Sequence, residues 1–437
     1  MPSQINRYDR FSKSSQADNR SAGQKDRDRI LYTSAFQRLA EVTQVVSPDE
    51  GHVFHNRLTH SLKVAQVARR LAEKLLNDPA QKQVADDLGG IDPDVTESAS
   101  LAHDIGHPPF GHIAEEELEN LVTDAGDPDG FEGNAQSFRI VTRLAVRAKQ
   151  GSQGLDLTRA TLNSLLKYPW LKGQGPKKNK WGAYRSEREE FLWARELVPA
   201  GDLRKSAEAE LMDWADDVTY AVHDAADFYA AGLMPLDRLA SLGDDSERKR
   251  FFDEVFRRLG TDLEFRRWEL EEAFTKLVTW MSFDQSFVGT REQRGQLRST
   301  ASALIERYIN AIALRYPKDS SELRISIDPE CQKEVLMLKQ LTWHYVILNP
   351  ALGAQQFGQK RIIRQLFRMF QEAARTAQHE DARIFPVEYR QEVEAAGGDD
   401  RKLTRIICDL IASMTEKQVY ALYARLTGND NSRTLLK

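Results

Sequence analysis

Histidine and acidic residues that could bind a metal ion or transfer protons are concentrated in one part of the chain. The sequence has nine histidines. Six lie between residues 52 and 112, namely His52, His55, His60, His103, His107 and His112. In the densest segment, LAHDIGHPPFGH over residues 101–112, a helix would end in adjacent His103 and Asp104, and Gly106 would let the backbone turn. Such a pair supplies an imidazole nitrogen and a carboxylate oxygen from one helical turn.

Two further ligands would complete a metal site. His60 lies near the apolar stripe of its predicted helix and so points partly inward. In segment 211–224, Asp216, Tyr220 and Asp224 are spaced i, i+4 and i+8 and share one helix face. A row of polar groups among apolar residues is costly to bury unless a cation pairs with it. His60, His103 and Asp104 are therefore candidate metal ligands, and this helix face would supply a further, acidic one.

Two histidines and two carboxylates suit a divalent cation. Mn, Fe, Zn, Ni and Co are all chemically compatible with this set, and we expect the cofactor to be Mn²⁺ or Mg²⁺. Such a cation would polarise a phosphoryl oxygen or generate hydroxide. Plainer explanations stay open, because an inward histidine is usually a hydrogen-bonded core residue. Acidic helix faces are normally solvated, so Asp213 and Asp227 are expected at the surface, and Asp217 is expected to face solvent or to support a ligand.

The elements that must position these residues are expected to be helices. Helical periodicity and capping signals predict helices over Thr59–Leu76, from Asp92-Pro93 to before Gly106, and over Leu211–Ala231, Gln293–Leu314 and Arg361–Ala377. Gly173–Lys180, rich in glycine, proline and lysine, predicts a loop. The β-branched run Leu323–Ile327 allows at most a small hairpin. The predicted fold class is therefore all-α.

Composition indicates the class of protein and its expected cellular location, but not the reaction. The 437 residues carry a net charge of −5, with 41% hydrophobic and 29% charged residues, which is typical of a globular protein. No apolar run approaches the roughly 20 residues of a membrane span. The polar N-terminus lacks the apolar core of a signal peptide, and Cys331 and Cys408 are too few for a disulfide framework. We therefore expect a cytoplasmic protein that does not enter a membrane.

Several short segments narrow the chemistry further. The main ones are RLTHSL at 57–62, HDIGHPPFGH at 103–112, FEGNAQS at 131–137 and ADDVTY at 215–220. Their H…HD…D order resembles the HD superfamily of phosphohydrolases. Together with SAFQRL at 34–39, TQV at 43–45, KYPW at 167–170 and GTR at 289–291, they are similar to the dGTPase-like triphosphohydrolases over roughly residues 30–315.

That resemblance implies an organisation of the chain and a reaction. We expect a polar arm over residues 1–27, an HD metallophosphohydrolase core over 28–240, and a helical region over 241–437 that contributes to the site and to oligomer contacts. The family's reaction converts a deoxynucleoside triphosphate (dNTP) and water to a deoxynucleoside and inorganic triphosphate. By that resemblance, His60, His103, Asp104 and Asp216 would hold the metal that orients the α-phosphate.

The resemblance also implies roles for residues around the metal. His112 with Glu115, three residues apart at a helix start, would form the acid/base pair, assisted by His107. The implied substrate contacts are Arg57, His107 and Arg291 to phosphate oxygens and Gln44, Tyr220 and Asp224 to the deoxyribose, where the tyrosine ring leaves no room for a 2′-hydroxyl. Surface salt bridges for the arginines, and core packing for Gln44 and Tyr220, are the plainer alternatives.

One position departs from the family pattern. Many members read FEHNAQS where this chain has Gly133, so one cationic or acid/base group is missing. Its loss would shift the burden to His107 and His112, lower the rate of turnover, or mark a branch of the family with altered substrate choice.

Other functions stay open. Another HD phosphodiesterase or nucleotidase could recruit His107 and His112 as additional metal ligands. A catalytically silent nucleotide sensor or single-stranded nucleic-acid binder would be consistent with Gly133 and with the basic segment Lys177–Lys180. The resemblance also implies a homo-oligomer, often a hexamer, with a nucleotide effector at subunit contacts.

Overall fold

The computed structural model describes residues 5–12, 19–45, 56–147, 154–260, 264–281, 283–319, 322–375 and 383–429. His52 and His55 of the histidine-rich segment lie outside these ranges. Within them, strands are confined to β1 (Ile312–Leu314) and β2 (Ile325–Ile327), which pair antiparallel with Ala313 opposite Ser326. The all-α prediction is confirmed, and the hairpin forms at the predicted β-branched run.

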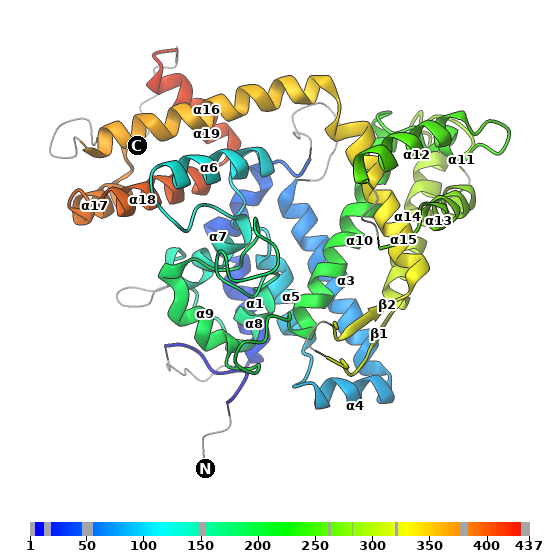
Figure 1. The fold of residues 1–437 in the computed structure, drawn as a ribbon, viewed down its shortest axis with the longest axis horizontal. Coiled ribbons are helices and arrows are strands. Elements are labelled where there is room, and N and C mark those ends of the chain that lie inside the picture. The colour runs from blue at the N-terminus through cyan, green and yellow to red at the C-terminus, as the bar shows by residue number, and fades with distance from the viewer. Residues whose placement is uncertain are drawn as a thin grey trace.

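Three helices pack together through the centre of the molecule (Figure 1): α3 (Arg57–Asn77), α5 (Pro93–Ala102) and α10 (Ala207–Ala230). Asp92 caps α5 and is followed by Pro93, as the sequence predicts. The buried faces of α3 and α10 belong to the same apolar cluster, which includes Val64, Val67, Leu71, Leu211, Val218 and Val222. Burial of these aliphatic faces fixes how α3 and α10 are oriented, and hence which polar side chains meet between them.

The N-terminal part of the chain is packed against this centre. Helix α1 (Ala22–Leu31) begins inside the range expected to be a polar arm and contacts α5. Ser21 and Gln24 form a capping box that starts the helix. Gly23 approaches Asp94 so closely that an added Cβ would lie 2.7 Å from the Asp94 Cβ. The region boundaries at residues 27 and 240 stay predictions.

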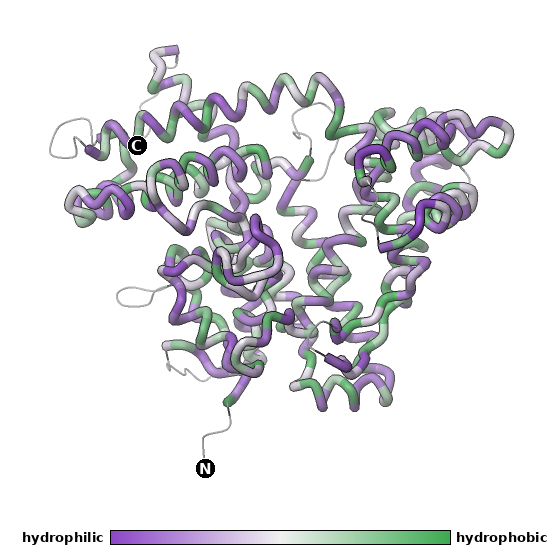
Figure 2. Tube along the Cα trace, viewed as in Figure 1, coloured by the Kyte–Doolittle hydropathy of each residue, from purple (hydrophilic) through white to green (hydrophobic). Residues whose placement is uncertain are grey.

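The C-terminal helices close over one end of the core. Helix α16 (Pro350–Arg375) crosses the top of the molecule and packs on α6 (His112–Asp124) and α18 (Asp400–Ser413) (Figure 1). Hydrophilic and hydrophobic residues alternate along α16 (Figure 2), and its apolar face packs into a buried cluster with α6 and α18. A C-terminal element is thereby brought against the helix that begins at His112.

Several predicted helices have different bounds in the structure, and α10, for example, begins at Ala207 rather than Leu211. Helix α14 (Arg291–Asn310) ends before Leu314, because residues 312–314 pair with β2. Helix α16 begins at Pro350 rather than Arg361, and Ala377 lies outside the described residues.

The remaining elements complete the helical fold. They are α2 (Ser34–Arg38), η1 (Leu39–Glu41), α4 (Pro79–Asp87), α7 (Gly133–Arg139), η2 (Ile140–Leu144), α8 (Arg159–Leu165), η3 (Arg185–Glu187), α9 (Arg188–Arg195), α11 (Leu236–Ala240), α12 (Ser246–Leu259), α13 (Arg267–Met281), α15 (Pro329–Thr342), η4 (Trp343–Ile347), α17 (Val387–Ala396) and α19 (Glu416–Leu426). Among the residues described, no helix has both the length and the apolar character needed to cross a bilayer.

Candidate metal centre and acid/base site

The four predicted metal ligands come from three different helices and meet at one point. His60 lies in the first turn of α3, His103 and Asp104 directly follow α5, and Asp216 lies midway along α10. The Asp216 Oδ1 atom is 3.0 Å from His60 Nε2 and 3.6 Å from His103 Nε2. The Asp104 Oδ1 atom is 3.5 Å from His103 Nε2. Packing of α3 against α5 and α10 therefore brings two imidazoles and two carboxylates together.

The orientation of the His103 ring fits a metal ligand. Its Nδ1 atom lies 2.6 Å from the Ser100 carbonyl oxygen, which can only accept a hydrogen bond, so Nδ1 carries the proton and donates it. The opposite nitrogen, Nε2, faces the carboxylates, is buried and makes no hydrogen bond among the described residues. A buried nitrogen without a hydrogen-bond partner beside two carboxylates is the arrangement that a divalent cation would satisfy.

One oxygen of each predicted ligand carboxylate, Asp104 and Asp216, accepts a hydrogen bond from a cationic side chain. Arg57 Nη1 donates to Asp104 Oδ2 at 2.8 Å, and Lys167 Nζ donates to Asp216 Oδ2 at 2.8 Å. In each carboxylate the second oxygen, Oδ1, is left facing the histidines. Burial opposes ionisation, but the charges of His103 and Arg57 on Asp104, and of Lys167 on Asp216, hold the pKa of both carboxyls well below its usual range. The four residues therefore fit a bound divalent cation.

The predicted acid/base pair lies at the start of α6. His112 Nδ1 is 2.7 Å from Glu115 Oε2, with the histidine side chain 70% exposed and the glutamate buried. Burial opposes ionisation of Glu115, but the hydrogen bond from His112 and the charge of Lys180 hold its pKa well below its usual range. An ionised Glu115 accepts a hydrogen bond from the Nδ1–H group of His112, which leaves Nε2 of this largely exposed ring for proton transfer.

His107 lies between the predicted metal ligands and the predicted acid/base pair. Its Nδ1 is 3.1 Å from Asp104 Oδ1, and its Nε2 is 3.9 Å from Glu115 Oε2. Burial and the charge of Arg57 lower the pKa of His107 to about 4, so the ring is neutral near pH 7. The ring also lies against Gly133, where an added Cβ would be 3.2 Å from the ring Cε1. Gly133 therefore gives space to a neighbouring histidine as well as lacking a side chain of its own.

The predicted substrate contacts are positioned less uniformly. Tyr220 and Asp224 extend along the α10 face that carries Asp216. Asp224 Oδ2 and Gln44 Oε1 are buried atoms without a hydrogen bond among the described residues, and burial raises the pKa of Asp224 well above its usual range. Arg291, the first residue of α14, is exposed and makes no hydrogen bond or ion pair in the described part of the chain. The roles of all four residues stay predictions.

One residue at the site lies in the predicted loop Gly173–Lys180. Lys180 Nζ donates to Glu115 Oε1 at 2.9 Å and to Glu132 Oε1 at 2.8 Å. The sequence predicted a loop here, with a basic segment that a single-stranded nucleic-acid binder could use, and no contact with the acid/base pair. Spacing offered no signal, because Lys180 is 65 residues from Glu115 and 48 from Glu132.

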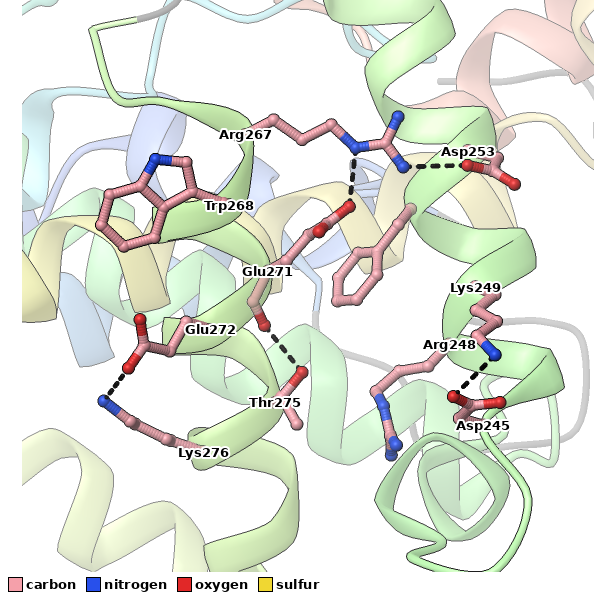
Figure 3. Close-up of a pocket in the computed structure, with 11 residues that line it drawn as sticks. Asp245, Arg248, Lys249, Asp253, Arg267, Trp268, Glu271, Glu272, Thr275 and Lys276 are labelled. Atoms are coloured by element: carbon pink, nitrogen blue, oxygen red, sulfur yellow. Dashed lines mark hydrogen bonds and ion pairs between the residues drawn. The ribbon is translucent and has the colours of Figure 1, made fainter.

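A separate hollow of about 710 Å³ lies between α12 and α13 (Figure 3). Most of its charged side chains pair with one another: Arg267 donates to Glu271 and Asp253 at 2.6 and 2.9 Å, and Lys276 pairs with Glu272 at 2.6 Å. None of the predicted site residues lines it. This surface hollow carries no sign of the predicted chemistry.

Comparison with known proteins agrees with the geometry. The HD domain matches residues 57–221, and the phosphohydrolase-associated domain matches residues 325–425. A deoxyguanosinetriphosphate triphosphohydrolase-like protein from Streptomyces coelicolor is 37% identical over 430 residues, which cover 94% of this chain and 93% of that protein. A protein of the same description from Corynebacterium efficiens is 36% identical, covering 95% and 93%.

A solved structure of a hypothetical protein from Aquifex aeolicus aligns with 66% of this chain and 68% of its own, at 16% identity and a TM-score of 0.24, which is too low to support a structural conclusion. The two relatives above match nearly the whole chain, and the HD domain match includes all four predicted metal ligands. The chain therefore belongs to the HD-domain phosphohydrolases and, among them, to the deoxyguanosinetriphosphate triphosphohydrolase-like proteins.

Proposed function

We propose that the chain hydrolyses dNTPs to a deoxynucleoside and inorganic triphosphate, with a divalent cation, Mn²⁺ or Mg²⁺, held by His60, His103, Asp104 and Asp216. The observation that carries this proposal is the pairing of each ligand carboxylate. One oxygen is held by a cationic side chain and the other faces the imidazoles, beside the His112–Glu115 pair. The names of the relatives support a deoxynucleotide substrate.

The side chains of the site suggest how protons move in this reaction. A bound cation would supply charge stabilisation to a phosphoryl oxygen. Hydrolysis breaks the bond between the α-phosphorus and the 5′-oxygen, water supplies a hydroxyl group to phosphorus, and a proton is needed at the 5′-oxygen. The exposed Nε2 of His112 can accept the proton of water and return it to the leaving oxygen, while Glu115 stabilises the charged ring.

Three residues are proposed to recognise the deoxyribose. Gln44 Oε1 and Asp224 Oδ2 are buried polar atoms without a hydrogen bond among the described residues, so a sugar hydroxyl could satisfy either atom. Tyr220 precedes Asp224 by one helical turn on the same face of α10 and would occupy the space that a 2′-hydroxyl needs.

The proposal is tested by product identity. The purified protein is incubated with each of the four dNTPs, singly and mixed, with Mn²⁺ or Mg²⁺, and products are separated by anion exchange beside Asp104→Ala. We expect deoxynucleoside and intact triphosphate, lost in the variant. Pyrophosphate or phosphate would indicate another HD phosphodiesterase or nucleotidase. No turnover would favour a nucleotide sensor or single-stranded nucleic-acid binder, tested by direct binding.

The oligomeric state is a further part of the proposal, supported only by the family resemblance. We propose a homo-oligomer, with a hexamer as one form and a nucleotide effector at its subunit contacts. Sedimentation that finds a monomer at micromolar concentration would contradict it.

A further inference from the structure

The loop that carries Lys180 is anchored to the core by aromatic residues. Trp170 Nε1 donates to the Lys180 carbonyl at 2.6 Å, and the Gly182 amide donates to the Trp170 carbonyl at 3.0 Å. Trp170, Trp181 and Tyr184 form a buried cluster with the first turn of α7. The backbone of Lys180 is therefore held in one place, unlike that of a solvated basic loop.

The Lys180 ammonium group lies between two buried carboxylates. Its Nζ atom is 2.9 Å from Glu115 Oε1 and 2.8 Å from Glu132 Oε1. Glu132 also accepts hydrogen bonds through Oε2 from the backbone amides of Asn134 and Ala135, which makes it the N-cap of α7. One cation thus connects the helix that carries the acid/base pair to the helix that begins at Gly133.

The two oxygens of Glu115 have separate partners. Oε1 accepts from Lys180 and from the Gly133 amide at 3.2 Å, whereas Oε2 faces His112 at 2.7 Å and His107 at 3.9 Å. Besides these groups, Glu132 is the charge that faces Glu115 across Lys180. Burial and the Glu115 charge raise the pKa of Glu132 even with Lys180 present. Two buried carboxylates without a cation between them would tend to share a proton.

We propose that Lys180 is a positioning residue for the acid/base pair: it fixes the Glu115 carboxylate with Oε2 toward His112 and keeps that carboxylate charged beside Glu132. This inference rests on the proposed function, because it assigns Lys180 to the same reaction. It also removes Lys180 from the exposed basic patch that a nucleic-acid binder would use.

The test compares Lys180→Met, Lys180→Arg and the control Lys178→Met, an exposed lysine of the same loop, in metal-loaded protein from pH 5.5 to 9. For Lys180→Met we expect kcat to fall about tenfold at pH 6 and less at pH 9, where the shared proton is lost, with KM changed less than about twofold. Lys180→Arg should retain most of the activity, and Lys178→Met should match the parent protein. Unchanged kcat in Lys180→Met, or a pH-independent loss with a raised KM, would overturn the positioning role.

A second readout separates this inference from the proposed function, because it needs no turnover. Without Lys180, ionisation of Glu115 and Glu132 opposes folding, so Lys180→Met should lower the thermal midpoint more at pH 8 than at pH 5, by about 2–4 °C at pH 8. Adding Glu132→Gln should reduce that pH dependence. If the parent protein hydrolyses no dNTP but this pattern appears, only the proposed function fails. If Lys180→Met lowers the thermal midpoint equally at pH 5 and pH 8, the positioning role of Lys180 is contradicted.

Discussion

The ring of His107 lies directly against the backbone of Gly133, so that a Cβ at residue 133 would be 3.2 Å from the ring Cε1 and Nε2 atoms. The same ring lies 3.1 Å from Asp104 Oδ1 and 3.9 Å from Glu115 Oε2, between the candidate metal ligands and the acid/base pair. The glycine that departs from the family pattern is therefore tied to the placement of this histidine. Any side chain at residue 133 would have to displace the ring.

Gly133→Ala should impair catalysis without unfolding the protein. The new methyl group would push the His107 ring away by a few tenths of an ångström, and we expect kcat to fall about tenfold, equivalent to about 1.4 kcal/mol in the activation barrier. The thermal midpoint should change little, because alanine favours helix formation. Gly358→Ala is the control, since that glycine lies in α16 with open space around it. Full activity of Gly133→Ala would mean that the ring position is unimportant.

A divalent cation should stabilise the fold, because the four proposed ligands come from three helical segments of the core. Mn²⁺ at about 100 times its dissociation constant would add about 2.7 kcal/mol to the free energy of unfolding, seen as a midpoint raised by a few degrees and reversed by a chelator. Asp104→Asn should abolish this increase, whereas Asp253→Asn, at an exposed position of α12, should keep it. Equal stabilisation of Asp104→Asn and the parent protein would place the bound cation elsewhere.

The metal-free protein should lose stability in mild acid because His107 is buried as a neutral ring. Its pKa is about 4 in the folded chain, against about 6.5 for an unfolded histidine. Between these values the unfolded chain binds the extra proton, so the contribution of His107 is complete above pH 6.5 and is lost as the pH falls to 4. The loss is roughly 3 kcal/mol.

Urea unfolding in chelator at pH 7, 5.5 and 4.5 measures this dependence. His107→Asn should show a shallower fall of the unfolding free energy over the same range. Parallel curves for the variant and the parent protein would assign the acid sensitivity to other groups.

Glu416, at the start of α19, should be needed for the geometry of the site although it lies far from it in sequence. Its carboxylate accepts from the Thr43 and Phe110 amides at 2.7 and 3.1 Å and from the Thr43 hydroxyl at 2.8 Å. Phe110 precedes His112 by two residues, in the turn that starts α6. Glu416→Gln would leave one buried donor unsatisfied, costing about 1–3 kcal/mol of stability and lowering kcat. The exposed Glu388→Gln serves as control, and full activity with an unchanged midpoint in Glu416→Gln would contradict this role.

The sequence by itself determined the features that depend on residue type and local spacing. Helical periodicity located α3 and α10, and Asp92 followed by proline located the start of α5. The adjacent His103 and Asp104 indicated a pair of metal ligands, because imidazole and carboxylate groups can be identified as such from residue type alone. Helix ends were not determined by local spacing alone. Helix α14 stops at Asn310 because residues 312–314 pair with residues 325–327, and this strand pairing outweighs helical periodicity there.

Only the tertiary structure decided which distant groups pair with each carboxylate in and around the site. Lys167 reaches Asp216 across 49 residues, Lys180 reaches Glu115 across 65, and Glu416 reaches Phe110 across 306. These pairs have no spacing that a sequence could reveal, because they are created by the packing of helices and loops on a shared apolar core. From the sequence, a lysine in a glycine-rich loop is expected to be solvated. In the structure an aromatic cluster anchors this loop and places the lysine beside two buried carboxylates. Residue types alone therefore indicate which side chains could act chemically. The distant charged groups that hold those side chains are placed by tertiary packing and burial, which the sequence does not show directly.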